Sequence, residues 1–324
     1  MEVAGAHVTV VLPTHRRPDS LRRAVAGLAR QKDPGVPWDV VIVDNDATPS
    51  AASSALVASD QLPVESRVVV EPVLGASNAR NRGIAEARGS IVAFIDDDVV
   101  PDDDWLSRLV EPVLAGRCDA VGGQVALDPT IPVPGWIPGW LRPYLAEYRP
   151  AVGETDLRDL PDGVLVEPYV LTANAAFTAD VLARAGGFDP LLGPRRGVPM
   201  VNDDVGLSRK VLALGATMRY VPDARVVHEL PRERLRRRYL VRRLYAQGRS
   251  DWLLDRGPLA ATRTAGAHTA TVAFAKEVVR DLRAGTMPRP QHTFLWCQAA
   301  RRAGFLRESL AELARRRTVH PADR

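Results

Sequence analysis

The sequence predicts an α/β protein with a mostly parallel, mixed sheet flanked by helices. Over the first 100 residues, short apolar runs alternate with helical patterns in steps of ~25 residues, which is typical of successive βαβ units. Three of these runs end in polar residues, and open α/β sheets bind their ligands beyond the carboxyl ends of the strands. The composition of 46% hydrophobic and 25% charged residues over 324 positions suits a globular protein and excludes a disordered tail.

Each predicted element has a local signal. Buried strands are expected at the apolar runs Val8–Leu12, Asp39–Val43, Val68–Val70 and Ile91–Ile95. A helix with Asp19 or Ser20 as its N-cap should bury Leu21, Val25 and Leu28. Further helices are expected at Ser50–Ser59, Ala76–Ala87, Thr178–Arg184, Leu207–Leu214, Arg232–Arg249, Ala270–Arg283 and Phe305–Arg317.

The segment Pro129–Pro143 contains five prolines and two tryptophans, Trp136 and Trp140. So many prolines are incompatible with a regular helix or a central strand, so we expect an ordered loop. The tryptophan rings either form a wall for an acceptor or fill the core.

Charge divides the chain. The net charge is +4, but residues 231–324 hold 21 basic and 8 acidic residues, a balance of +13, and the rest is acidic. This asymmetry predicts a body over residues 1–229 and a helical, Arg-rich extension over residues 230–324. We expect the extension to bind phosphates of the ligand through Arg236–Arg238, with the remaining arginines solvated. Peripheral contact with anionic lipid at the inner face of a membrane stays open.

The two cysteines, Cys118 and Cys297, form no CxxC motif, so a thiolate metal site and a disulfide framework are not expected. No apolar run approaches the ~20 residues that span a bilayer, and the N-terminus lacks a signal-peptide pattern. A cytoplasmic protein is therefore expected, and the preference for arginine over lysine suits a GC-rich bacterial genome.

The most informative acids are Asp96, Asp97 and Asp98, directly after the run Ile91–Ile95. Three adjacent carboxylates repel one another, which raises a pKa or requires a cation. Mg²⁺ binds one or two protein carboxylates and completes its shell with phosphates and water. The triplet alone is also compatible with an acidic surface turn.

The neighbouring motifs favour the binding site. The chain resembles the inverting family 2 glycosyltransferases of the GT-A fold, over motifs that run in the family's order from Val8 to Glu229. The matching segments are VTVVLPTHRRPDSLRRAVAGLARQ, VVIVDNDATPS, GASNARNRGIAEARGSIVAFIDDDVVPDDDWL, LTANAAFTADVLARAGGFDPLLG and NDDVGLSRKVLALGATMRYVPDARVVHE.

The resemblance implies a nucleotide-diphosphate sugar donor, with a UDP-sugar favoured over guanine or thymine nucleotides, and Mg²⁺ or Mn²⁺ as cofactor. It implies that Asp98 is the metal ligand and that Asp96 contacts either the metal or the ribose. Asp97 would share either role, and His228 would lie near the metal. The implied nucleotide site comprises Pro13, Thr14, Arg16, Asp44, Arg80, Asp96 and Asp97, although Arg16, like Arg17 and Arg82, also reads as a solvated side chain. The implied acceptor side comprises Trp136, Trp140, Asn174 and Asp203.

Inverting transfer needs a base that takes the acceptor's proton. Asp203 and Asp204 match the family's Glu-Asp pair, so the resemblance makes Asp204 the base and Asp203 an acceptor or orienting contact. Both residues would also serve as ordinary charges at a helix N-terminus.

Other classes of protein fit less well. The first strand is not followed by GxGxxG and the chain has no GxxxxGK[ST], which disfavours a dinucleotide oxidoreductase and a P-loop NTPase. A nucleic-acid binder is disfavoured by the acidic body. A degenerate nucleotide-binding scaffold of the same fold remains the alternative. The acceptor, whether a small molecule, a lipid-linked saccharide or a polysaccharide, and the oligomeric state are not predicted.

Overall fold

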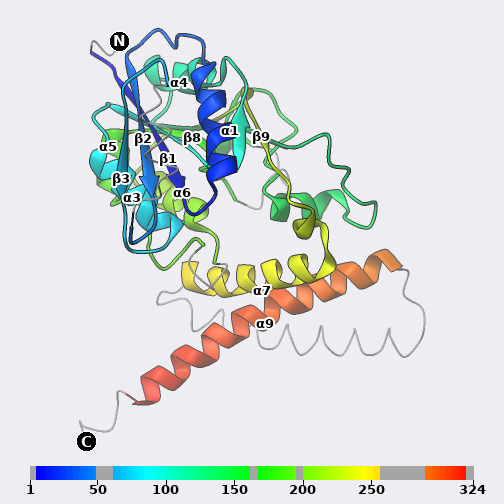
Figure 1. Cartoon of the computed structure of the whole chain (residues 1–324). Coiled ribbons are helices and arrows are strands. Elements are labelled where there is room, and N and C mark those ends of the chain that lie inside the picture. The colour runs from blue at the N-terminus through cyan, green and yellow to red at the C-terminus, as the bar shows by residue number, and fades with distance from the viewer. Residues whose placement is uncertain (1–4, 49–60, 161–166, 195–199, 256–288, 319–324) are drawn as a thin grey trace, which may run out of the picture. The chain divides into compact units, whose positions relative to one another are not determined.

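The computed structural model describes residues 5–48, 61–160, 167–194, 200–255 and 289–318 (Figure 1). Its contacts divide the chain into two units: one comprises Met1–Ile131, Leu145–Arg196 and Asp203–Leu230, and the other Pro132–Tyr144, Gly197–Asn202 and Pro231–Arg324. Two predicted helices, Ser50–Ser59 and Ala270–Arg283, lie outside the described residues.

The first unit is built on one mixed sheet with the strand order β3-β2-β1-β4-β8-β6-β9-β5, with β7 paired to β9 (Figure 1). Its strands are β1 (Val8–Thr14), β2 (Trp38–Asp44), β3 (Ser66–Val70), β4 (Ile91–Ile95), β5 (Val99–Pro101), β6 (Ala120–Leu127), β7 (Thr155–Asp156), β8 (Asn174–Thr178) and β9 (Met218–His228). The four predicted strands are confirmed as β1 to β4, which pair in parallel. Strand β8 runs antiparallel to both β4 and β6.

Helices connect and cover these strands. They are α1 (Pro18–Ala29), α3 (Ala76–Glu86), α4 (Trp105–Leu114), α5 (Ala179–Ala185) and α6 (Asp203–Ala213). Helix α3 packs on β1 and β2, and α4 packs on β6 and β9. The α/β fold is thus confirmed, with an apolar core along both faces of β1, β2 and β4.

The start of α1 differs from the prediction. The helix begins at Pro18, with Arg17 in the N-cap position and Asp19 inside the first turn. Proline suits the first helical position because its missing N–H would have no partner there. The N-cap prediction of Asp19 or Ser20 is therefore wrong.

The proline-rich segment lacks a regular α-helix or strand, as expected, and includes the 3₁₀ turn Gly139–Leu145. Other 3₁₀ turns are Leu157–Asp159 and Arg232–Leu235. The second unit contains α7 (Arg237–Leu254) and α9 (Arg289–Thr318), which pack on each other. None of the helices in the described ranges is long and apolar enough to cross a membrane.

Two glycines set the spacing of α7 and α9. A Cβ atom on Gly248 would lie 1.7 Å from the carbonyl oxygen of Arg301, and one on Gly304 would lie 1.9 Å from that of Tyr245. The crossing is therefore a reciprocal contact of backbone on glycine. Beside it, Arg249 donates to Glu308 at 2.5 Å, and Arg301 donates to Asp251 at 2.6 Å.

The two cysteines occupy interior positions in different parts of the chain. Cys118 precedes β6 and Cys297 lies in α9, and both are buried as free thiols. Burial raises the pKa of Cys118 to about 12 and that of Cys297 to about 11. Neither is a reactive thiolate at neutral pH.

Candidate active site

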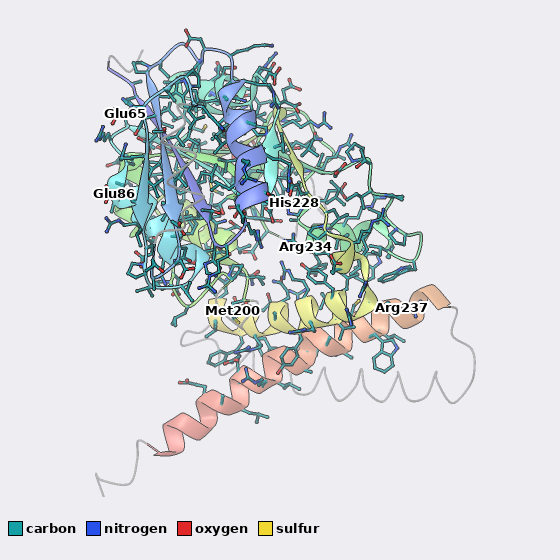
Figure 2. All side chains as sticks on the ribbon, in the orientation of Figure 1. Glu65, Glu86, Met200, His228, Arg234 and Arg237 are labelled. Atoms are coloured by element: carbon teal, nitrogen blue, oxygen red, sulfur yellow. The ribbon has the colours of Figure 1, made fainter. Side chains whose placement is uncertain are left out.

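Polar side chains gather at the carboxyl edge of the parallel strands. Thr14 and Asp44, the last residues of β1 and β2, lie opposite each other in the register of the sheet. Asp96 directly follows Ile95, the last residue of β4, which neighbours β1 on its other side. Strand β9 ends at His228 (Figure 2). The position of this edge is the one at which open α/β sheets bind ligands.

Asp97 and Asp98 form a compact polar cluster with residues from β1 and β9. The Thr14 hydroxyl donates to Asp97 at 2.8 Å. One Nη of Arg17 donates to Asp97 at 3.1 Å and to Asp98 at 3.0 Å. The Nε2 atom of His228 lies 3.6 Å from an Asp98 oxygen. The predicted metal ligands Asp98 and His228 are thus neighbours.

The environment of Asp97 disfavours its charged form. Burial raises the pKa of Asp97 to about 6; Arg17 and the Thr14 hydrogen bond act in the opposite direction, while Asp98 raises it further. Crowded, buried carboxylates of this kind need a positive partner. In this structure Arg17 supplies the positive charge.

Arg80 joins Asp96, the acid that directly follows β4, to the start of α6. Its guanidinium donates to Asp96 at 2.7 Å and to Asp203 at 2.6 Å, and lies over the ring of Phe188 at 5.7 Å. Burial alone would lower the pKa of Arg80, but Asp96 and Asp203 raise it above its ordinary value. The Arg80 side chain is buried and bridges two acids, and its expected contact with the nucleotide stays a prediction.

Asp204 is the best candidate for a base. Thr172 donates both its backbone N–H, at 3.0 Å, and its hydroxyl to the same oxygen, Oδ1 of Asp204. Burial and then the charge of Asp203 raise the pKa of Asp204 to about 7, against Arg80 and Thr172, which lower it. A carboxylate that titrates near neutrality is suited to take a proton.

The antiparallel strand β8 explains how Asp204 reaches this edge. Its first residue, Asn174, lies opposite Ile95, the last residue of β4, so the segment that precedes β8 ends beside the carboxyl end of β4. That segment is tied to α6 twice, through Thr172 on Asp204 and through the Val170 N–H, which donates to Ser208 Oγ at 3.2 Å. The N-terminus of α6 is thereby held beside the acids that follow β4.

Asn174 itself does not face an acceptor. Its side chain is fully buried, accepts from the indole N–H of Trp105 at 2.7 Å, and donates to the carbonyl oxygens of Gln124 and Ala224 at 2.9 and 2.7 Å. The acceptor-side interpretation of Asn174 is corrected accordingly: the amide joins α4, β6 and β9 to the start of β8. Sequence reasoning could not distinguish these two roles because both place an Asn at a strand end.

Three residues predicted to line the pocket of the nucleotide base lie at the ends of β1 and β2, and their contact with a base stays a prediction. Asp44 is buried at the end of β2, and Pro13 is partly buried one residue before the end of β1. Arg16 is exposed and donates to Asp46 at 2.5 Å. The backbone of Arg16 is left-handed, with φ of 53°, which marks a strained corner between β1 and α1.

The tryptophans belong to the second unit. There the guanidinium of Arg237 lies over the Trp136 ring at 5.4 Å, and the Trp140 side chain is 42% exposed. Trp140 is thus not a core residue. Whether these rings, or Arg236–Arg238, contact a substrate stays a prediction.

Two residues of the candidate site were not predicted from the sequence. Arg17, which pairs with Asp97 and Asp98, was expected to be a solvated side chain, and no sequence motif pointed to Thr172, which donates to Asp204. The position of Arg17, just beyond β1 at the same edge as the acids, was a usable hint. No local pattern marks Thr172, because its role depends on a helix 32 residues further along the chain.

The side chains that could ligate a metal here suit an ion that also binds phosphate. Within the described ranges no group of three or more His, Cys, Asp or Glu side chains is arranged to hold an ion. Asp98 and His228 supply two donors, and the guanidinium of Arg17 is a cation that already stands between Asp97 and Asp98. Mg²⁺ in proteins commonly has one or two side-chain ligands and otherwise phosphate and water.

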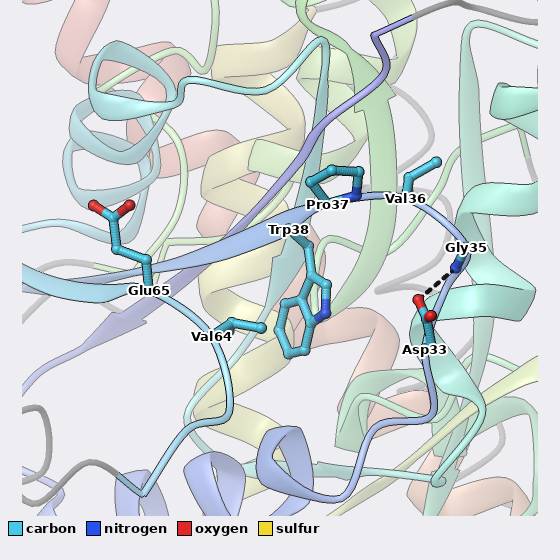
Figure 3. A pocket seen from close by; sticks show the side chains of 7 residues that line it. All are labelled: Asp33, Gly35, Val36, Pro37, Trp38, Val64 and Glu65. Carbon is cyan, nitrogen blue, oxygen red and sulfur yellow. Dashed lines mark hydrogen bonds between the residues drawn. The ribbon is translucent and has the colours of Figure 1, made fainter.

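An open depression lies elsewhere, at the amino ends of β2 and β3 (Figure 3). It is lined by Asp33, Gly35, Val36, Pro37, Trp38, Val64 and Glu65. Its position before these strands, where the Gly35 N–H donates to Asp33 at 2.8 Å, is opposite to the ligand-binding edge of such a sheet. We do not assign it to the candidate active site.

The mixed sheet, with acids at the ends of its parallel strands, is that of a GT-A fold. A solved structure shares this fold: the mannosyltransferase PcManGT from Pyrobaculum calidifontis, in complex with GDP-Man and Mn²⁺, has a TM-score of 0.59 at 20% sequence identity, covering 93% of this chain and 86% of that one.

The sequence comparisons find glycosyltransferases similar to this chain. The model described as "Glycosyl transferase family 2" matches residues 9–156. The succinoglycan biosynthesis protein ExoM of Rhizobium meliloti is 27% identical over 246 residues, which cover 75% of this chain and 74% of that protein. Glycosyltransferase AglE of Haloferax volcanii is 31% identical over 121 residues, which cover 36% of this chain and 39% of that protein. Residues 9–156 of the chain are therefore similar to glycosyl transferase family 2.

Proposed function

We propose that the chain is an inverting glycosyltransferase that moves a sugar from a nucleotide-diphosphate sugar to a hydroxyl or amine of an acceptor. A UDP-sugar is the favoured donor. One observation carries the proposal: Asp204, whose pKa is raised to about 7, is linked through Asp203 and Arg80 to Asp96 beside the acids that follow β4. A proton acceptor and a phosphate-binding edge are thereby held in one framework.

The proposed reaction is a single displacement. The acceptor oxygen or nitrogen attacks the anomeric carbon of the donor, its proton passes to Oδ2 of Asp204, and the bond from the anomeric carbon to the diphosphate oxygen breaks. The nucleoside diphosphate leaves with the bonding electron pair. Thr172 keeps Oδ1 engaged, so the second oxygen of Asp204 is the one left to take the proton.

The leaving diphosphate needs positive charge. We propose that Asp98 and His228 hold a divalent ion, Mg²⁺ or Mn²⁺, which when bound would neutralise the diphosphate as the bond breaks. Asp44, Thr14 and Pro13 would line the site of the nucleoside.

The acidic and the basic part of the chain are assigned different functions. We propose that residues 1–229 bind the donor and perform the transfer. Residues 230–324 would act as a helical, basic extension that assists substrate binding, with Trp136 and Trp140 of the preceding loop on the acceptor side.

Thermal-shift titration tests the proposal. UDP, GDP, TDP and NAD are added with and without Mn²⁺ to the wild type, to Asp98→Ala and to Asp204→Asn. We expect one nucleoside diphosphate to raise Tm only with Mn²⁺, in the wild type and Asp204→Asn but not in Asp98→Ala. Stabilisation by NAD without metal, or by no nucleotide, would contradict the proposed site. Binding without turnover of any donor sugar would favour the degenerate scaffold.

A further inference from the structure

Arg17 is a cation that spans two buried acids from an exposed position. A single Nη atom reaches both Asp97, at 3.1 Å, and Asp98, at 3.0 Å. The Arg17 side chain is 49% exposed, whereas those of Asp97 and Asp98 are 6% and 12% exposed. Arg17 therefore covers two buried carboxylates with a side chain that is itself half exposed to solvent.

The backbone directs Arg17 into this position. At the left-handed corner between β1 and α1, consecutive side chains separate: Arg16 pairs with Asp46, and Arg17 pairs with Asp97 and Asp98. Arg17 is the N-cap residue of α1 and makes no side-chain cap hydrogen bond there. Its guanidinium therefore does not cap α1 and instead pairs with Asp97 and Asp98.

We propose that Arg17 exchanges partners during donor binding: it neutralises Asp97 and Asp98 in the free protein, yields Asp98 to the divalent ion, and then pairs with the donor's diphosphate. This inference rests on the proposed function, since it assumes a metal-dependent diphosphate site. A guanidinium and a divalent ion compete for the same carboxylate oxygen, and a displaced guanidinium is suited to bind phosphate.

The exchange predicts opposite effects on two ligands. Removing the guanidinium removes a competitor, so Mn²⁺ alone should bind more tightly. It also removes a diphosphate partner, so a metal-loaded diphosphate should bind less tightly. A residue with a purely structural role would weaken both or leave both unchanged.

The experiment measures Mn²⁺ affinity by electron paramagnetic resonance, and pyrophosphate affinity by calorimetry at a fixed Mn²⁺ concentration. The variants are Arg17→Gln, Arg17→Lys and the control Arg22→Gln, which removes the same charge from an exposed side chain of α1 paired with Asp19. We expect Arg17→Gln to bind Mn²⁺ roughly fivefold more tightly and pyrophosphate roughly fivefold more weakly, as for the loss of a partly exposed ion pair. Arg17→Lys should lie between it and the wild type, and Arg22→Gln should match the wild type.

Two other results would overturn the exchange, and they differ in what they leave standing. Equal Mn²⁺ affinity in the wild type and Arg17→Gln, or weaker binding by a variant whose Tm is unchanged, would overturn the exchange and leave the metal site standing. Absence of Mn²⁺ binding in every variant, with or without pyrophosphate, would overturn both the exchange and the proposed metal requirement.

Discussion

Asp204 shows how neighbouring side chains give a carboxylate its chemistry. The pKa of Asp204 is raised by burial and by Asp203, and lowered by Arg80 and by the two hydrogen bonds from Thr172. Without the lowering by Arg80 and Thr172, the pKa of Asp204 would be higher still, and less of its carboxyl group would be in the basic form at neutral pH. The donors of Thr172 therefore keep its basic form populated near pH 7.

The hydroxyl of Thr172 can be tested on this basis. Thr172→Val keeps the backbone N–H donor and the shape but removes the hydroxyl, so the pKa of Asp204 should rise. Because the base must be deprotonated, the rising limb of the pH–rate profile should move to higher pH, by up to ~1 unit for one lost hydrogen bond. Thr172→Ser should restore the wild-type limb. An unchanged profile in Thr172→Val would contradict the assignment of Asp204 as the base.

The close packing of α7 and α9 in the second unit requires glycine at two positions. Gly248 and Gly304 let the backbones of α7 and α9 touch, and any Cβ would meet a carbonyl oxygen at less than 2 Å. Backbone atoms cannot yield as a side chain does, so the helices would have to separate. The ion pair of Arg249 with Glu308 would be strained at the same time.

Gly248→Ala is expected to destabilise this helix pair by about 1–3 kcal/mol, the usual range for overpacking. Hydrogen exchange of the amides of α7 and α9 measures the effect, because it reports local opening. Val241→Ala is the control, since Val241 is a partly exposed residue of the same helix. Unchanged protection in Gly248→Ala would mean that the close crossing does not form in solution.

Elements were predictable from the sequence where their signals are local. The strands β1 to β4 are apolar runs, and α3 and α6 have helical patterns, so the carboxyl edge with Asp96–Asp98 followed from alternation alone. The pairing of β8 between β4 and β6 was not predictable, because strand direction and partner depend on distant chain. The bridges of Arg80 and Arg17 were missed for the same reason: their partners come together only in the folded sheet.

At the scale of the whole molecule, the acid proposed as the base, Asp204, lowers the stability of the ligand-free fold when it is ionised. The pKa of Asp204 is raised from its ordinary value of 3.8 to about 7, so the folded state binds that proton more tightly than the unfolded chain does. The unfolding free energy should therefore increase as pH falls from above 7 towards 4, and decrease as pH rises.

Asp204→Asn should remove this pH dependence because an amide does not ionise. At pH 8 we expect the variant to unfold with a free energy higher than that of the wild type by up to about 4 kcal/mol, at 1.36 kcal/mol per pKa unit. At pH 4 the two proteins should be nearly equal. Urea unfolding at both pH values measures the difference. A variant less stable than the wild type at pH 8 would show that the Asp204 carboxylate is not a cost to the fold.

The burial of Cys118 and Cys297 has a consequence for chemical modification. Both thiols are shielded, with pKa values far above neutrality, so alkylating reagents should leave the native chain unlabelled. A cysteine introduced at an exposed position of the first unit, such as Val73 in the loop between β3 and α3, would be the one fast-reacting thiol. A fluorophore attached there would need no cysteine-free background, and a change in its emission would report the proposed binding of nucleotide at the neighbouring strand ends.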